Sequence, residues 1–242
     1  MPASPGEIAL HREGYFVGLE PRAPWTWVQR IRLRPEAVRP AVDDVRGVMR
    51  EHGKKLASWW VSDWSTPPDV EERLLACGLS IIEEDYDIAA LALTREPPPA
   101  PPGVVVRRTA SVEEHLAASH VTRAAFELPA NRWVSDDEAA EDYDATRGSD
   151  AAVTYLAWVD GEPVGTARAY FGPRGALLAG GSTLHEYRGR GAYCALVRAR
   201  WDDAAARGTP ALVVSAGSQS EPTLRRLGFE QACRFRRLQD DL

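Results

Sequence analysis

The sequence predicts an α/β protein with two compact halves, and three observations support this. Segments with the apolar patterns of strands alternate with segments of helical periodicity. The length of 242 residues suits one large or two small domains. A proline-rich stretch at residues 97–103 interrupts both patterns, because proline fixes φ and lacks an amide donor. We therefore expect an N-terminal domain over residues 1–96, a linker over 97–103 and a second domain over 104–242.

The second half contains clear start and stop signals. Ser111 followed by Glu114 is typical of a helix start, and Asp160-Gly161 between two apolar runs indicates a two-residue hairpin turn. Gly208 is placed to end a helix. The expected elements are strand 104–107, a helix from Ser111 to about Phe126, a further helix, strands 151–158, 164–171 and 175–184, helix 192–207, strand 211–215, helix 221–227 and strand 230–238.

The first half contains a weak echo of this ending. Both halves show the order helix, glycine, strand, short helix, glycine and strand, so we expect an internal repeat with one short insertion. Coincidence is the alternative, because this local order is common. The segments of the first copy are helix 35–51, Gly53, strand 56–61, a helix from Asp69 to Cys77-Gly78-Leu79 and strand 81–93; those of the second end at Gly208 and Leu227-Gly228-Phe229.

Composition and charge argue against several classes of protein. The chain is 44% hydrophobic and 26% charged, as in globular proteins. Its 29 Lys and Arg against 35 Asp and Glu give a net charge of −6, which disfavours nucleic acid or an anionic membrane as partner. No apolar run approaches the roughly 20 residues of a membrane span, and the start lacks the pattern of a signal peptide. We expect a cytoplasmic protein.

The cysteines and histidines do not indicate a metal site. Cys77, Cys194 and Cys233 are an odd, widely spaced set that suits neither a disulfide framework nor a CxxC site. No two of the five histidines stand at the i, i+4 spacing of a helical metal site. We expect reduced thiols and no bound metal.

The most informative segment, Arg188-Gly189-Arg190-Gly191, joins strand 175–184 to helix 192–207. Two glycines let the backbone turn its amides toward one point, and the first amides of a helix are unpaired and carry partial positive charge. Such a turn binds phosphate, and each arginine beside it can grip phosphate oxygens with two hydrogen bonds. The segment therefore predicts a polyphosphate ligand. A glycine-rich connection with merely solvated arginines is the alternative.

Two common nucleotide patterns do not fit this segment. It lacks the Gly-Lys-Ser/Thr ending that places a lysine on the β- and γ-phosphates, and it lacks the GxGxxG spacing of dinucleotide sites. A nucleotide-binding protein is thus the least favoured hypothesis. Magnesium-dependent binding of ATP would indicate it.

The segment resembles the signature of the GCN5-related N-acetyltransferases (GNAT), Q/R-x-x-G-x-G/A, which holds the pyrophosphate of acetyl-coenzyme A. Arg188 and Gly191 match it, Tyr193 stands where the family has Gly or Ala, and Leu227-Gly228-Phe229 looks like the family's closing motif. The resemblance covers residues from about 104 to 242. It implies a mixed, mostly antiparallel, twisted sheet flanked by helices, with a smaller, degenerate GNAT-like α/β N-terminal half.

The resemblance also implies where acetyl-coenzyme A would lie. Amides of Ser182, Thr183 and Leu184 would pair with the pantetheine arm like an added strand. The tyrosine that in this family often protonates the leaving thiolate falls at Leu224, so the usual acid is absent. The catalytic residues stay unassigned, with Tyr193, Ser220 and Glu186, and beside them Ser218 and His185, as weak candidates that ordinary packing or capping also explains. The implied cofactor-binding residues are Ser182, Thr183, Leu184, Arg188, Gly189, Arg190, Gly191, Ala192 and Tyr193.

The acceptor is expected at residues 126–133, where the family places its acceptor loops, with Glu127 and Trp133 as candidate contacts. The first half has no glycine before its helix at Leu33-Arg34-Pro35-Glu36, so we expect no second coenzyme there. Its tryptophans would serve either core packing or an acceptor-facing wall; they are Trp25, Trp27, Trp59, Trp60 and Trp64.

Together these features predict an N-acetyltransferase that moves an acetyl group from acetyl-coenzyme A to an amine. The amine would attack directly in a ternary complex, without an acyl-enzyme. The alternative is a non-catalytic acyl-coenzyme A sensor or interaction domain. The expected partners are acetyl-coenzyme A and an amine acceptor, and the chain would act as a monomer or a homodimer.

Overall fold

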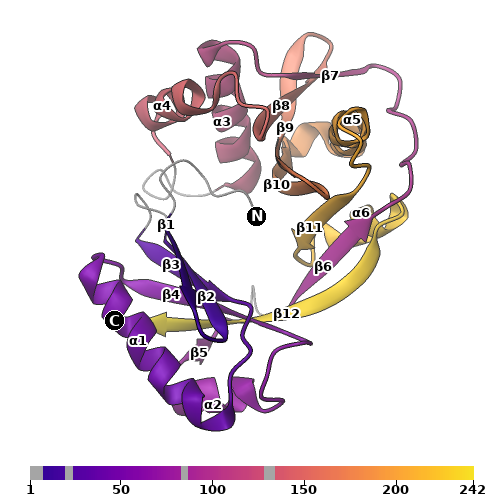
Figure 1. Ribbon diagram of the computed structural model, residues 1–242. Coiled ribbons are helices and arrows are strands. Elements are labelled where there is room, and N and C mark those ends of the chain that lie inside the picture. The colour runs from indigo at the N-terminus through magenta and orange to yellow at the C-terminus, as the bar shows by residue number, and fades with distance from the viewer. Residues whose placement is uncertain (1–7, 20–23, 83–86, 128–133) are drawn as a thin grey trace. The chain divides into compact units, whose positions relative to one another are not determined.

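The computed structural model describes residues 8–19, 24–82, 87–127 and 134–242, and the chain divides into two compact units (Figure 1). The C-terminal unit comprises Leu91–Ser215 and Pro222–Glu230. The N-terminal unit comprises the described part of Ala3–Ala90 together with Ala216–Glu221 and Gln231–Leu242. Neither unit is continuous in sequence, because Ala216–Glu221 and Gln231–Leu242, from the second half of the chain, belong to the N-terminal unit. The domain bounds expected at residues 97 and 104 stay a prediction.

The C-terminal unit contains a mixed, mostly antiparallel sheet with the strand order β6-β11-β10-β9-β8-β7. Strands β7 to β10 pair antiparallel, and β10 pairs parallel with β11. Helices α3 and α4 lie on one side of β8, β9 and β10, and α5 lies on the other (Figure 1). The elements are β6 (Asp87–Leu93), β7 (Val104–Arg108), α3 (Val112–Phe126), α4 (Asp136–Thr146), β8 (Ala152–Val159), β9 (Glu162–Gly172), β10 (Gly175–Thr183), η4 (His185–Tyr187), α5 (Ala192–Ala206), β11 (Leu212–Ala216) and α6 (Glu221–Arg226).

Local chemistry explains these elements. The predicted bounds of β7, α3, β8, β9, β10, α5, β11 and α6 are confirmed within two residues at each end. The Ser111 hydroxyl accepts a hydrogen bond from the Glu114 amide and starts α3. Asp160 and Gly161 have φ of +53° and +87°, the two positive values that a tight hairpin turn between β8 and β9 requires. On the outer face of α5, Arg198 pairs with Asp202 at 2.8 Å, as its spacing predicts.

The N-terminal unit has the strand order β1-β2-β3-β4-β12, with β5 also paired to β12. Strands β3 and β4 pair in parallel, and β1–β2, β2–β3, β4–β12 and β5–β12 pair antiparallel. The elements are β1 (Ile8–Arg12), β2 (Tyr15–Leu19), β3 (Trp25–Gln29), η1 (Pro35–Ala37), α1 (Val38–Glu51), β4 (Leu56–Ser62), α2 (Val70–Ala76), β5 (Ser80–Ile81) and β12 (Glu230–Asp241).

Two expectations for this unit need correction. The sequence did not predict β1, β2 and β3, because these five-residue strands are short and β1 is exposed along most of its length. The single strand expected over 81–93 is two strands, β5 and β6, with residues 83–86 outside the described part. The tryptophans divide: Trp59 is fully buried in the core, whereas Trp25 and Trp64 are 48% and 60% exposed.

The internal repeat is confirmed by backbone geometry. The series β1-β2-β3-α1-β4-α2 has the same pairing directions as β8-β9-β10-α5-β11-α6. After the first helix of each copy, the amide of Lys54 donates to Met49 O at 2.8 Å and that of Thr209 to Ala204 O at 3.0 Å. After the second, Leu79 donates to Leu74 O and Phe229 to Leu224 O. The glycine before each donor has a positive φ, as this helix ending requires.

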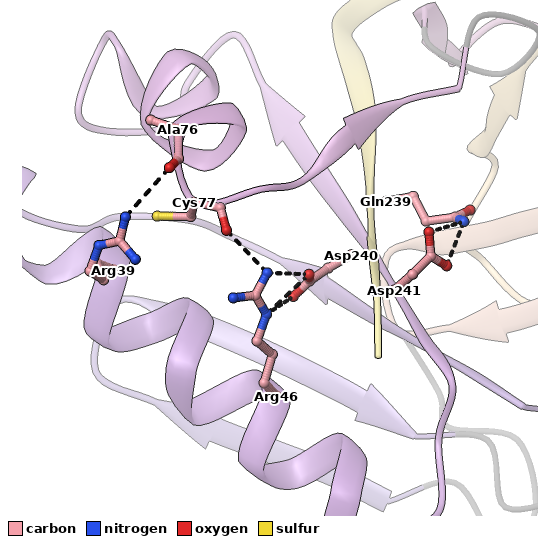
Figure 2. Close-up of polar contacts among 7 residues, drawn as sticks. All are labelled: Arg39, Arg46, Ala76, Cys77, Gln239, Asp240 and Asp241. Carbon is pink, nitrogen blue, oxygen red and sulfur yellow. Dashed lines mark hydrogen bonds and ion pairs between the residues drawn. The ribbon is translucent and has the colours of Figure 1, made fainter.

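A buried ion pair fastens the last strand to the N-terminal unit (Figure 2). Asp240 on β12 is 1% exposed at its side chain and accepts hydrogen bonds from Nε and Nη2 of Arg46 on α1, the shortest at 2.6 Å. The same Nη2 donates to the carbonyl oxygen of Cys77 at 3.1 Å, at the end of α2. One guanidinium therefore holds α1, α2 and β12 together.

Replacing Asp240 with Ala should lower the free energy of unfolding by about 3 kcal/mol, because the Arg46 guanidinium would lose its buried partner. The neighbouring Asp241→Ala is the matched control. Its carboxylate is exposed and bonds only to Gln239 among the described residues, so its loss should change stability by less than about 0.5 kcal/mol. Urea unfolding followed by circular dichroism measures both. Equal effects would contradict the role given to the pair.

Candidate functional site

The glycine loop between β10 and α5 has backbone amides that point to no protein partner. Gly189 and Gly191 have φ of +77° and +88°, and Gly191 is the N-cap of α5 without a side-chain cap. The amides of Tyr187, Arg188 and Arg190 bond within the loop. Within the described part of the chain, no oxygen accepts from the amides of Gly189 or Gly191. The loop therefore offers unpaired donors at the positive end of a 15-residue helix.

The two arginines of the loop are held differently. Arg188 donates from Nε to Thr183 O at 3.4 Å and from Nη2 to Ala125 O at 3.3 Å, which ties the loop to the ends of β10 and α3. Among the described residues, no carboxylate pairs with it. Arg190 pairs with Asp160 at 3.0 Å, and its guanidinium lies 5.3 Å from the centre of the Tyr187 ring. The charge of Arg188 is thus left uncompensated beside the amides.

The end of β10 has one edge without a strand partner. Its pairing with β11 covers Ala176–Leu178 and stops there. Its register with β9 shifts between Ala179 and Ser182, where Gly180 has φ of +57°. The buried hydroxyls of Ser182 and Thr183 have no hydrogen-bond partner among the described residues. The Thr183 hydroxyl lies 3.4 Å from the position of a Cβ on Gly165 of β9, so it lies on a face of the sheet, and the open edge itself consists of backbone groups.

The corresponding gap in the N-terminal unit is closed. There Leu33 donates its amide to Thr66 O at 3.0 Å, and Thr66 donates its amide to Ile31 O at 3.2 Å. The two segments form an isolated parallel bridge between Arg32 and Thr66. The helix that follows starts at Pro35 without glycine. Of the two copies, the C-terminal one is therefore the one with an open strand edge beside a glycine loop.

Gly191 is required for space as well as for backbone angle. A Cβ at this position would lie 2.5 Å from Cγ of Pro101, in the proline-rich segment. That segment also bonds to the middle of α5, where Arg198 donates to Pro97 O at 3.2 Å and pairs with Glu96. The prolines thus lie along α5 and against the loop. At Gly189, in contrast, a Cβ would meet nothing within 4 Å.

The structure separates the candidate catalytic residues. The ring of Tyr193 packs on β10, with Cε2 3.0 Å from the position of a Cβ on Gly181. Ser220 bonds to the carbonyl of its own turn at Gly217, and Ser218, His185 and Glu186 are exposed. Leu224 is fully buried. Arg200, which the sequence did not single out, is fully buried on the same helix as Tyr193.

The expected acceptor segment lies mostly outside the described residues, since 128–133, including Trp133, are not described. Glu127 is exposed and ends α3 with φ of +52°. Both described flanks are anchored: Asp136 at the start of α4 accepts from His120 and Arg123 of α3. Further along, Asp142 lies between His115 at 3.1 Å and Arg168 at 3.0 Å. These pairs fix α4 to α3 and β9.

Two other findings concern possible functions. Among the residues that the structure describes, no three His, Cys, Asp or Glu side chains gather as a metal site would need. No helix in the same part of the chain has the length and apolar character to cross a membrane.

Comparison with models of protein families gives a match in the C-terminal half of the chain. The model of the acetyltransferase (GNAT) family matches residues 119–229, which contain the glycine loop and the Leu227-Gly228-Phe229 turn. No curated protein matches the sequence.

Three solved structures are similar over most of the chain. A GCN5-related N-acetyltransferase from Kribbella flavida is 20% identical with a TM-score of 0.73, over 97% of this chain and 89% of that one. Another from Sphaerobacter thermophilus is 17% identical with a TM-score of 0.70, over 94% and 76%. A tandem GNAT protein from the clavulanic acid biosynthesis pathway is 17% identical with a TM-score of 0.63, over 94% and 78%. These likenesses confirm the predicted fold class.

Adding a methyl group to the two loop glycines should separate strain from crowding. Gly189→Ala introduces only an unfavourable positive φ, which costs about 1 kcal/mol. Gly191→Ala adds the clash with Pro101 and should cost at least about 2 kcal/mol. Urea unfolding measures both changes. In a Pro101→Gly background the difference should disappear; a difference that persists would show that Pro101 is not its cause.

The carboxylate of Asp142 should contribute a pH-dependent part of the stability. Burial alone would raise its pKa, but the hydrogen bond from His115 and the charge of Arg168 outweigh burial and lower the pKa below the ordinary value of 3.8. A carboxylate whose pKa is lower in the folded than in the unfolded state contributes stability at pH values above its ordinary pKa. This contribution is lost as the pH falls through the folded-state pKa. Asp142→Asn should therefore lower the unfolding free energy at pH 7, and the gap to wild type should close in acid. The exposed Asp144→Asn is the control, and a gap independent of pH would refute the assignment.

Proposed function

Residues 119–229 of this chain belong to the acetyltransferase (GNAT) family, and from this premise we propose that the protein moves an acetyl group from acetyl-coenzyme A to an amine. One observation carries the proposal: beyond Leu178 β10 has no pairing with β11, and the loop that follows β10 and η4 holds the unpaired amides at the start of α5. A pantetheine diphosphate has the matching shape, an extended amide chain that ends in two phosphates. The glycine loop and the strand edge can bind both parts at once.

The donor would be held by main chain more than by side chains. Amides of Gly189, Gly191, Ala192 and Tyr193 would receive the diphosphate, and the charge of Arg188 would add attraction. Ser182 and Thr183 would pair with the pantetheine amides as an added strand. The pairing expected from Leu184 is not available, because its amide already donates to Val164 O at 2.9 Å and its carbonyl accepts from Tyr187 at 3.0 Å. Since the Arg188 side chain also fixes the loop, its contribution to binding is both electrostatic and structural. Arg190, already paired with Asp160, would lie at the edge of the diphosphate.

The chemistry would be direct attack in a ternary complex. The acceptor nitrogen must be neutral, because an ammonium has no lone pair, and the thioester carbonyl must be fixed against hydrogen-bond donors as negative charge develops on its oxygen. The backbone amides along the free edge of β10 are such donors. The main contribution of the enzyme is then to position the two substrates. We propose that this occurs in the cytoplasm, in a monomer or a homodimer.

One observation favours a second candidate, a non-catalytic acyl-coenzyme A sensor. The position of the family's usual thiolate acid is Leu224, which is fully buried and has no proton to donate. A site that binds the donor and lacks an acid could serve to sense acyl-coenzyme A. The two candidates differ in turnover and share donor binding.

Release of coenzyme A from acetyl-coenzyme A, measured against a panel of aminoglycosides, polyamines and amino acids, should separate these candidates. We expect saturable turnover with at least one amine. Tight binding of coenzyme A in calorimetry without turnover on any amine would favour the sensor. Failure to bind coenzyme A would overturn both candidates.

The variant Arg188→Ala/Gly191→Glu should abolish binding of coenzyme A. It removes a cation and places a carboxylate at the helix start, where it repels the diphosphate. Arg188→Ala/Gly191→Gln is the matched control, because it carries the same truncation and the same crowding without the negative charge. We expect the control to bind at least about tenfold more tightly than the Glu variant in calorimetry. Equal affinities would show that no phosphate lies at this helix start.

A further inference from the structure

We propose that the phenol of Tyr193 donates a proton to the departing thiolate of coenzyme A, and that Arg200 is the positioning residue that stabilises the resulting phenolate. This inference rests on the proposed function. It assigns the acid that Leu224 cannot supply to a residue on a different helix.

Tyr193 packs on the face of β10 at Gly181. Its ring covers Gly181, and its hydroxyl oxygen is 3.7 Å from the position of a Cβ there. Gly181 stands within the stretch between Ala179 and Thr183, where pairing with β11 has ended. The Tyr193 hydroxyl donates to no described residue, so its proton is available to a ligand bound at this part of β10. Serine or leucine at 193 would reach less far, and the absence of side chains at Gly180 and Gly181 leaves room for the ring.

Arg200 lies on the same face of α5 as Tyr193, since the two positions are two helical turns apart. It is 1% exposed. Its Nε donates to Leu196 O at 2.9 Å and its Nη1 to Arg168 O at 3.4 Å, so both described partners are neutral carbonyls. Its Nη2 is buried and has no partner among the described residues. Burial lowers the pKa of the guanidinium to about 10, which keeps it charged at neutral pH.

A buried charge without a carboxylate is unfavourable, so its presence calls for a compensating role. A phenolate at Tyr193 would provide the missing negative charge. Burial raises the pKa of Tyr193 and keeps the phenol protonated before reaction, whereas the charge of Arg200 acts in the opposite direction and lowers it. The pair therefore holds a proton at rest and tolerates its departure.

The proposed step balances without any further reagent. The amine nitrogen forms a bond to the thioester carbonyl carbon, the C–S bond breaks, and its electron pair stays on sulfur. The phenolic proton of Tyr193 passes to sulfur and gives free thiol and phenolate. The proton that the new amide nitrogen loses returns to the phenolate through solvent.

The other candidate acids are less well placed. The Ser220 hydroxyl donates to Gly217 O at 3.4 Å. Glu186 is exposed on η4. Tyr155 is the other tyrosine whose charge affects the pKa of Arg200. Its hydroxyl already donates a hydrogen bond to Asp203, so its proton is engaged.

Tyr193→Phe tests the proton donor, because it removes the hydroxyl and keeps the ring on Gly181. With acetyl-coenzyme A and the fastest amine of the panel, kcat should fall by about 100-fold, while the calorimetric Kd for coenzyme A stays within about twofold. Tyr143→Phe is the matched control: its hydroxyl donates to Ala110 O, outside the proposed site, and kcat should not change. An unchanged kcat in Tyr193→Phe would overturn the proposal.

A double-mutant cycle tests Arg200. Arg200→Met keeps the volume and removes the charge, a change that buried sites often tolerate. It should lower kcat by about tenfold in the wild-type background and cause no further loss in the Tyr193→Phe background. Arg200→Lys should restore part of the rate. Equal losses in both backgrounds would mean that Arg200 acts only on the fold, and would overturn its assignment.

The two levels of proposal fail in different ways. Wild-type turnover that Tyr193→Phe leaves intact removes this inference and keeps the transferase. Coenzyme A binding without turnover in the wild type removes the transferase, and the inference with it.

Discussion

The parting of β10 from β11 is the constraint on which the candidate site depends. Three residue pairs hold the two strands in parallel, and beyond Leu178 the edge of β10 continues alone toward the glycine loop. Beyond that edge, the amides of Gly189 and Gly191 are further donors that have no acceptor among the described residues. An extended ligand with amides and phosphates satisfies both parts.

The sequence predicted local backbone conformation well where a residue type is required by a turn or a helix end. Gly189, Gly191 and Gly208 adopt the positive φ that their positions imply, and Ser111 caps α3 as expected. The sequence predicted less where contacts between distant segments determine the structure. Nothing local to Arg198 or Gly191 announces that Pro97 and Pro101 lie against them. The bounds of α4 were missed, although Ser135 and Glu138 form a capping box that the sequence displays.

Buried charge was the largest gap in prediction from sequence. Position 200 lies on the apolar face of α5, four residues after Leu196 and four before Ala204, but the charge of an arginine there argues for solvent; the side chain is nevertheless buried beside neutral carbonyls. The same holds for Arg46 and Asp240, which are far apart in sequence and meet only because β12 joins the N-terminal unit. Pairing of distant residues depends on topology. A strand that leaves its own half of the chain cannot be read from a local pattern.

The two copies of the repeat together argue for a ligand more strongly than either does alone. A parallel strand pair that opens leaves backbone groups to be satisfied, and each copy meets this requirement in its own way. The N-terminal copy closes the gap with Thr66, whose amide and carbonyl bond to Ile31 and Leu33, and it has no glycine at the helix start. The C-terminal copy has no such bridge in its described part and keeps both glycines. In the N-terminal copy, a single threonine on a connecting loop, Thr66, closes the gap. A C-terminal copy that bound no ligand would be closed in the same simple way. An open edge on β10 beside a positively charged loop is the arrangement that binding of a phosphate-bearing acyl donor requires.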